Sequence, residues 1–262
     1  MVANHFTSIG FNVSTKEDLN ALIQRAMKEG EDVSCPNGAY VKWAIGAGIE
    51  LWVHLDTHGR KISSFSPHFS GPSRAILGIT EIRNDPSIHT LLEGSIDAWA
   101  APRSEDPTTG LYPLTLDVPD FDALRTNLKL GGKYTFQIAA FGHSLSCFKD
   151  KEAFKAEQLK HPVGVRDGHP YTFGPESFIP TGQFTRITGG KLKAEAMFSG
   201  LVSETEELTN PFSGRNFLHL LVRTYGIDVD IVADPTIVKG SPIVGGIVIG
   251  TFWMSGRLAS TK

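Results

Sequence analysis

The clearest local pattern of the chain lies in residues 5–30, HFTSIGFNVSTKEDLNALIQRAMKEG. Residues 5–13 alternate apolar and polar side chains, which predicts a strand. Ser14 and Glu17 then have the spacing of a capping box, in which each side chain accepts a hydrogen bond from the other residue's backbone amide. Apolar residues follow at helical spacing up to Gly30, which is placed to end a helix. We therefore predict a strand followed by a helix.

Three further strands are predicted between residues 39 and 69, with turn residues between them. In the middle strand, residues 49–55, four aliphatic side chains share one face, and Glu50, Trp52 and His54 share the other. We expect the face with Glu50 and His54 to be open to solvent. The first module, residues 1–72, therefore has the order βαβββ.

Composition restricts the rest of the chain to a β-rich architecture. The 262 residues include 27 glycines and 15 prolines, 42 in total, spread along the whole length. Long helices need stretches free of both residues, so a mostly helical protein is excluded. A hydrophobic content of 40% is enough to build cores and argues against disorder. We predict an α+β protein that is predominantly β.

An internal repeat is indicated in the second part of the chain. Gly94 and Gly200 each begin a run that leads to a Pro-x-x-Gly turn and then to a strand with leucines and a valine at matching offsets. We therefore predict two related small antiparallel β-barrel units, in residues 73–184 and 185–262. The second, over residues 195–258, resembles an oligonucleotide/oligosaccharide-binding (OB) fold with a glycine-rich closing strand.

The first module also resembles a known superfamily. Its βαβββ order, with His5 on the first predicted strand and Glu50 on a later one, resembles one module of the vicinal oxygen chelate (glyoxalase/dioxygenase) superfamily. The resemblance implies a divalent metal ion on His5 and Glu50 and a lyase-like or dioxygenase-like activity. That superfamily closes its site with two modules, and residues from 74 onward lack a second suitable helix. The remaining ligands would therefore come from a second subunit or from later residues.

The whole chain also resembles a group of bacterial proteins with an HFTSIGF-like first strand and an FWMSGR-like last strand, a resemblance that implies no activity.

A proline- and glycine-rich stretch, residues 161–182, predicts a long irregular connector at the end of the first β unit. Loops on a rigid scaffold carry function more often than cores do, so we expect a binding edge here. Its candidate binding residues are His161, Arg166, Asp167, His169 and Glu176.

Other chemically capable residues are interpreted as structural. They are His58 in a turn, His68 at a strand end, His143, Ser144, Ser146 and Cys147 on one predicted strand, and Trp99, Phe252, Trp253 and Arg257 among the aromatic set.

Two functions remain open. The favoured one is a binding or assembly protein without its own catalytic set, because the sequence holds no nucleotide-binding glycine loop and no nucleophile elbow. Its partners would be a second copy of the chain, an unidentified small molecule or another protein. The alternative is the metal-dependent enzyme of vicinal oxygen chelate type. A net charge of −3 argues against nucleic acid, and the absence of a secretory signal or a bilayer-long apolar run predicts a cytoplasmic protein without membrane contact.

Overall fold

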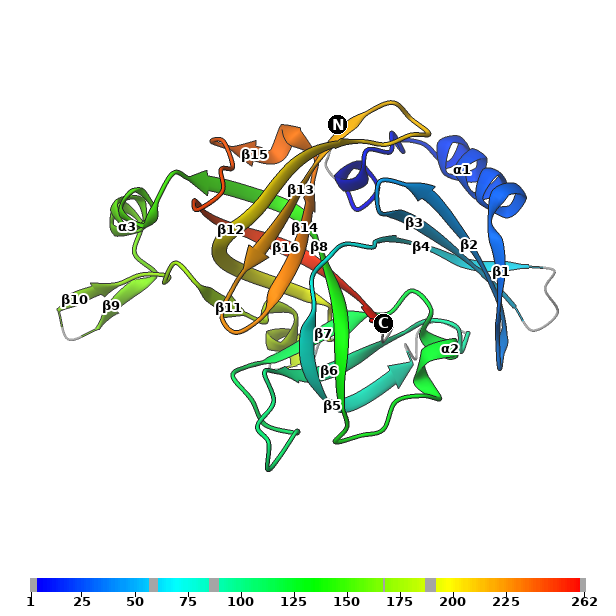
Figure 1. Ribbon diagram of the computed structural model, residues 1–262, viewed down its shortest axis with the longest axis horizontal. Coiled ribbons are helices and arrows are strands. Elements are labelled where there is room, and N and C mark those ends of the chain that lie inside the picture. Colours follow the sequence, from blue (N-terminus) through cyan, green and yellow to red (C-terminus); the bar gives the residue numbers. More distant parts are fainter. Residues whose placement is uncertain (1–3, 57–60, 85–89, 167, 187–191, 260–262) are drawn as a thin grey trace.

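The computed structural model describes residues 4–56, 61–84, 90–166, 168–186 and 192–259. Within these residues the protein is β-rich, with a four-stranded sheet, a ten-stranded sheet and a separate two-stranded hairpin. The four-stranded sheet and its helix lie against one side of the larger sheet, and the hairpin projects on the other side (Figure 1). None of the described helices combines the length and the apolar character needed to cross a membrane.

The N-terminal module begins with a short 3-10 helix, η1 (Thr7–Ile9), where a strand was predicted. The Asn4 side-chain carbonyl accepts two of the next backbone amides, at 2.9 and 3.0 Å, and Gly10 closes the turn with φ 78°. Such local side-chain bonds compete with strand pairing. The predicted strand at residues 5–13 is therefore wrong, and the module does not have the order βαβββ.

The predicted helix is confirmed as α1 (Lys16–Glu29). Its capping box is shifted by one residue, because Thr15 accepts from the Asp18 amide at 3.0 Å and Asp18 accepts from the Thr15 amide at 2.9 Å. Gly30 follows the helix as predicted, but it has an extended conformation rather than a left-handed one.

The three strands predicted after the helix are present, and one more precedes them. The antiparallel sheet runs in the order β1 (Glu31–Cys35), β2 (Gly38–Gly46), β3 (Ile49–Leu55) and β4 (Ile62–Phe69). All seven residues of β3 are buried. The face with Glu50, Trp52 and His54 is therefore not open to solvent, because Leu92 packs on Trp52 and the Arg257 guanidinium lies 4.6 Å from the Trp52 ring.

The ten-stranded sheet closes on itself twice. Its strands are β5 (Ala75–Asn84), β6 (Gly94–Ala100), β7 (Pro113–Asp117), β8 (Lys133–Phe148), β11 (Ser177–Ile179), β12 (Glu195–Thr209), β13 (Asn216–Arg223), β14 (Asp228–Ala233), β15 (Val238–Lys239) and β16 (Ile247–Leu258). Strands β5, β6, β7, β16 and β8 form one closed ring, the first ring. Strands β12, β13, β14, β8 and β16 form the second ring. The two rings thus share the long antiparallel pair of β8 and β16 as a common wall.

The two rings have the same topology. Each contains a three-stranded meander and one long strand, and the last meander strand runs parallel to the long strand of the other half. Ala75 pairs with Phe136 in the first ring, and Ala196 pairs with Phe252 at the corresponding place in the second. This topology equates β5 with β12 and β6 with β13. The predicted match of Gly94 on β6 with Gly200 on β12 is therefore shifted by one strand.

Alternation along the shared strands separates two cores. Ile138 and Ala140 of β8 point into the core enclosed by the rings, whereas Ala139 and Phe141 face the N-terminal module. The shorter elements that complete the chain are α2 (Phe121–Arg125), α3 (Lys151–Lys160), β9 (Gly164–Arg166), β10 (His169–Tyr171), η2 (Thr181–Arg186) and η3 (Pro235–Ile237).

The segment predicted to be an irregular connector contains three short strands. β9 and β10 pair antiparallel, and β11 joins the edge of the larger sheet. Gly168, with φ 78°, supplies the left-handed turn residue between β9 and β10. The Asp-Gly sequence at 167–168 is a typical hairpin signal, and it outweighs the surrounding prolines.

Candidate ligand cleft

Glu50, a predicted metal ligand, lies in a cluster of opposite charges. Its carboxylate contacts Lys42 Nζ at 2.7 Å and Arg257 Nη1 at 3.1 Å, and it accepts from Trp52 Nε1 at 3.1 Å. Burial raises the pKa of Glu50, but the charges of Arg257 and Lys42 outweigh burial and hold the pKa below its usual range. The carboxylate therefore already has cationic partners within the protein.

His5, the other predicted metal ligand, has a different set of neighbours. Its Nε2 atom lies 3.2 Å from His143 Nε2, and its ring stacks on Trp253 with centroids 4.2 Å apart. Burial, together with the neighbouring His143, lowers the pKa of His5 to about 4. None of the contacts of these two residues joins His5 to Glu50. Among the described residues, no group of three or more His, Cys, Asp or Glu side chains is arranged to hold a metal ion.

His68 is the centre of a buried chain of hydrogen bonds, which we call the polar relay (Ser255, His68, Gln137, Asp230 and His219). Gln137 Nε2 donates to Asp230 Oδ2 at 2.7 Å, so the Gln137 oxygen accepts from His68 Nε2 at 2.8 Å. His68 Nδ1 then accepts from Ser255 Oγ at 2.9 Å. His219 Nε2 donates to Asp230 Oδ1 at 2.9 Å. Ser255, His68 and Asp230 are completely buried, so the relay joins the N-terminal sheet to the rings and is closed to a substrate.

The other candidate nucleophiles also have structural partners. Ser144 Oγ lies 2.8 Å from Thr251 Oγ1. The adjacent His143 contacts His5 instead. Burial raises the pKa of Cys147 to about 11, so the thiol form prevails at neutral pH. Phe252 belongs to the core of the rings.

The structure separates the predicted binding residues into two places. His161 and His169 are exposed, at the base and on the second strand of the hairpin, and Arg166 ends β9. Asp167 lies outside the described residues, as does His58. Glu176 alone lines a cleft.

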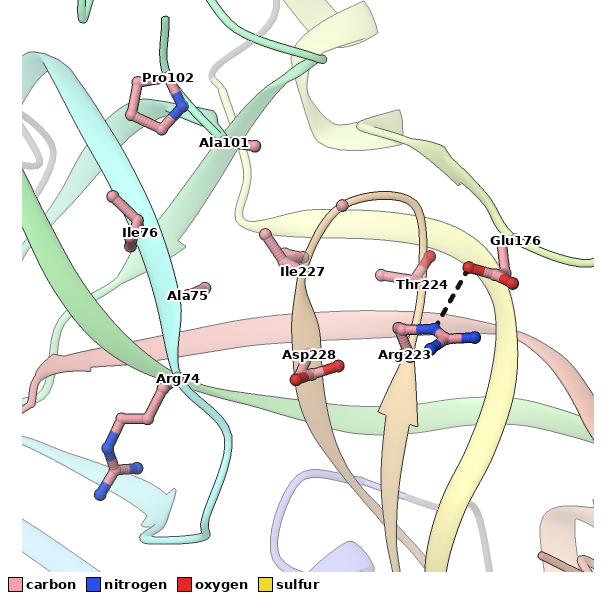
Figure 2. A pocket seen from close by; sticks show the side chains of 11 residues that line it. Arg74, Ala75, Ile76, Ala101, Pro102, Glu176, Arg223, Thr224, Ile227 and Asp228 are labelled. Atoms are coloured by element: carbon pink, nitrogen blue, oxygen red, sulfur yellow. Dashed lines mark ion pairs between the residues drawn. The ribbon is translucent and has the colours of Figure 1, made fainter. Parts of the chain in front are cut away.

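This cleft, of about 560 Å³, opens where the two rings meet. Figure 2 shows its walls: the start of β5 with Arg74 and Ile76 on one side, and the turn between β13 and β14 on the other. Glu176 lies beside the second wall, and Pro102 closes one end. Its lining residues are Arg74, Ala75, Ile76, Ala101, Pro102, Glu176, Arg223, Thr224, Gly226, Ile227 and Asp228.

The four charges of the cleft are matched only in part. Arg223 Nε lies 3.6 Å from Glu176 Oε2, which forms one ion pair. Asp228 is the cross-strand neighbour of Arg223, yet no contact within the described chain pairs its carboxylate. Arg74 donates from Nη1 to two backbone carbonyls of its own loop, at 2.6 and 3.1 Å, and has no ion pair in the described part of the molecule. Within the described part of the chain, the cleft therefore presents one carboxylate and one guanidinium that lack a charged partner.

Sequence reasoning identified Glu176 and missed Arg74, Arg223 and Asp228. Arg74 directly precedes β5, whereas Arg223 and Asp228 lie on β13 and β14 about 150 residues later, and only ring closure brings these strands together. A local signal exists for two of them, because Arg223 and Asp228 flank the turn Thr-Tyr-Gly-Ile. The sequence matches no model of a known protein family and no curated protein, and the fold matches no solved structure.

Proposed function

We propose that this protein is a non-catalytic binding protein that holds a small ligand of mixed charge in the cleft. The observation that carries the proposal is a pair of cleft-lining charges, Asp228 and Arg74, neither of which has a charged partner among the described residues. The volume falls within the range of small-molecule sites, roughly 300–1,000 Å³. Ile76, Pro102 and Ile227 add an apolar wall.

The chemistry of the lining selects the ligand class. A ligand ammonium group can pair with Asp228, and a ligand carboxylate can pair with Arg74, whose planar fork suits carboxylates. The apolar wall favours a hydrophobic side chain between these two charges. A free apolar amino acid or a short peptide has this combination of groups. The vicinal oxygen chelate alternative stays a prediction, without a donor cluster among the described residues to support it.

The architecture supports a further part of this proposal, that the rings descend from one duplicated OB-like unit. The two rings repeat the same meander and the same long strand, and the cleft lies at their junction. In this view the ligand binds at the junction of the two duplicated units, and neither unit would form this cleft alone.

Isothermal titration calorimetry tests the ligand class. The panel contains leucine, phenylalanine and Leu-Leu, with N-acetyl and carboxamide analogues that each lack one charge. We expect binding of the zwitterions, and a loss of roughly tenfold or more in affinity for either analogue, since a charge-assisted hydrogen bond contributes about 1.5–3 kcal/mol.

Variants locate the binding. Asp228→Asn and Arg74→Gln each remove one cleft charge and are expected to weaken binding by the same factor as the matching analogue. Glu204→Gln and Lys155→Gln change exposed charges outside the cleft lining and serve as matched controls. Equal affinity of the cleft variants and the controls would exclude the cleft, and no heat from any zwitterion would exclude the ligand class.

A further inference from the structure

The charged and the apolar residues of the ligand cleft lie toward different ends of it. Figure 2 shows Arg74 and Asp228 toward one end, which we call the charged end. Ile76, Ala101 and Pro102 lie toward the other, which we call the apolar end. The cleft therefore suits a ligand that gathers its charges in one part and its apolar surface in another.

The apolar end continues beyond the cleft lining onto an exposed side chain. The Ile76 carbonyl accepts from the Ala101 amide at 3.2 Å, which holds these two lining residues together. The side chains of Ala101 and Leu111 both lie where a side chain on Gly226, another lining residue, would be. Ile76 is 56% exposed and Leu111 is 43% exposed. Contiguous exposed apolar surface of this kind is typical of a site that an occupant covers.

We propose that the ligand is a free α-amino acid with a large apolar side chain, bound with its ammonium and carboxylate groups at the charged end and its side chain against Ile76. This assignment rests on the proposed function and narrows its ligand class. In an α-amino acid both charged groups and the side chain branch from one carbon. The charges can therefore pair with Asp228 and Arg74 while the side chain extends away from both toward the apolar end.

A dipeptide fits this arrangement less well than a free amino acid. Its ammonium and carboxylate groups are separated by a peptide unit, so they cannot both lie at the charged end without leaving the peptide unit against the apolar end. The side chains of Ile76, Ala101 and Pro102 offer that unit no hydrogen bond. A polar group that leaves water without a hydrogen-bonding partner is costly.

Ile76 is the position at which selection of the ligand side chain can be tested without disturbing the fold. Its neighbours on β5, Ala75 and Leu77, point into the core of the rings, so Ile76 points away from that core. Substitution of Ile76 therefore changes the apolar end of the cleft and leaves core packing in place.

Isothermal titration calorimetry of the full chain with phenylalanine, leucine, alanine and Leu-Leu tests the proposal. We expect phenylalanine and leucine to bind roughly tenfold or more tightly than alanine, because an apolar pocket discriminates by about that factor between side chains that differ in size. Leu-Leu should bind roughly tenfold or more weakly than leucine. The weak binding of alanine is measured by its competition with phenylalanine.

Variants at Ile76 assign the preference to the apolar end. Ile76→Ala should weaken phenylalanine binding about five- to tenfold and leave alanine binding within about twofold, because a residue couples to the ligand group that it touches. Ile76→Leu keeps an apolar side chain of similar size and should retain the preference for phenylalanine. Ile62→Ala shortens a 41% exposed isoleucine on β4, outside the cleft lining, and is the matched control that should leave both affinities unchanged.

Three results would overturn the amino-acid assignment while leaving a zwitterion site in the cleft. They are equal affinity for alanine and phenylalanine, Leu-Leu binding as tight as that of leucine, and an Ile76→Ala variant that weakens alanine and phenylalanine by the same factor. Absence of binding by all four ligands would overturn the proposed function itself, and the assignment with it.

Discussion

The polar relay and the ligand cleft are both built from polar side chains at a junction between parts of the fold, yet they differ in how those side chains are satisfied. In the relay, Asp230 accepts from Gln137, His219 and the Ser73 amide, at 2.7 to 3.0 Å, in complete burial. In the cleft, Asp228, two residues earlier on the same strand, has no such donors among the described residues. Two positions on the same face of one strand thus have opposite roles.

This difference separates a structural polar group from a candidate binding group. Inside the protein a hydrogen bond is strengthened by the low local dielectric, and an unpaired buried group is correspondingly costly. A group as buried as Asp230 must therefore find all its partners within the chain. A group that faces solvent can keep its bonding capacity for a ligand.

The largest expected effect is that of Asp230→Ala. The substitution leaves three buried donors without an acceptor, so we expect the free energy of unfolding to fall by about 3–5 kcal/mol. Urea denaturation measures it. Asp228→Ala, on the same strand, is the matched control and should change the free energy by no more than about 0.5 kcal/mol. Similar losses for the two variants would contradict the division between relay and cleft.

The second effect is a loss of stability in acid that originates in the relay. Burial lowers the pKa of His68 to about 4, against an ordinary value of 6.5. Between these values the unfolded chain binds a proton that the folded chain does not, so stability falls as the pH falls from 6.5 towards 4 and is unaffected above 6.5. For His68 this amounts to about 2 kcal/mol at pH 5.

Unfolding at pH 7.5 and pH 5 isolates this contribution. His54, whose pKa burial also lowers to about 4, adds to the loss in the unmodified protein, so the variant His68→Gln should retain part of it. We expect the loss between the two pH values to shrink by about 2 kcal/mol in His68→Gln. The exposed His169→Gln should leave the loss unchanged. A loss that is the same in both variants would mean that His68 titrates normally.

The parts of the fold that sequence patterns predict are those that local periodicity determines. The helix α1 follows from an apolar stripe and a cap, and β2, β3 and β4 follow from alternation between turn residues. β1 was missed because EDVSC has a single large apolar residue, Val33. Asn4 converts the alternating stretch after it into a 3-10 turn, since a side-chain acceptor outweighs a pattern that has no strand to pair with.

Burial of polar faces and the position of the cleft depend on contacts far apart in the sequence. Alternation in β3 shows that Glu50 and His54 share a face, but the groups that cover this face come from residue 92 and residue 257. Likewise, Arg74 and Asp228 meet at one cleft because β8 and β16 close two rings. Ring closure leaves no local signature, so Glu176 was the one cleft residue that sequence reasoning selected.

The smallest expected effect is on the cleft side of the comparison. Arg223→Ala removes the ion pair with Glu176, whose atoms lie 3.6 Å apart in a solvent-accessible setting. Exposed pairs contribute about 0–1 kcal/mol, so the free energy of unfolding should fall by less than about 1 kcal/mol, and raising the salt to 0.5 M should remove most of that change. Urea denaturation of Arg223→Ala at low and high salt measures both values. A loss above about 2 kcal/mol that salt leaves intact would place Arg223 with the relay as a structural residue, and the cleft would then retain only Asp228 and Arg74 for binding.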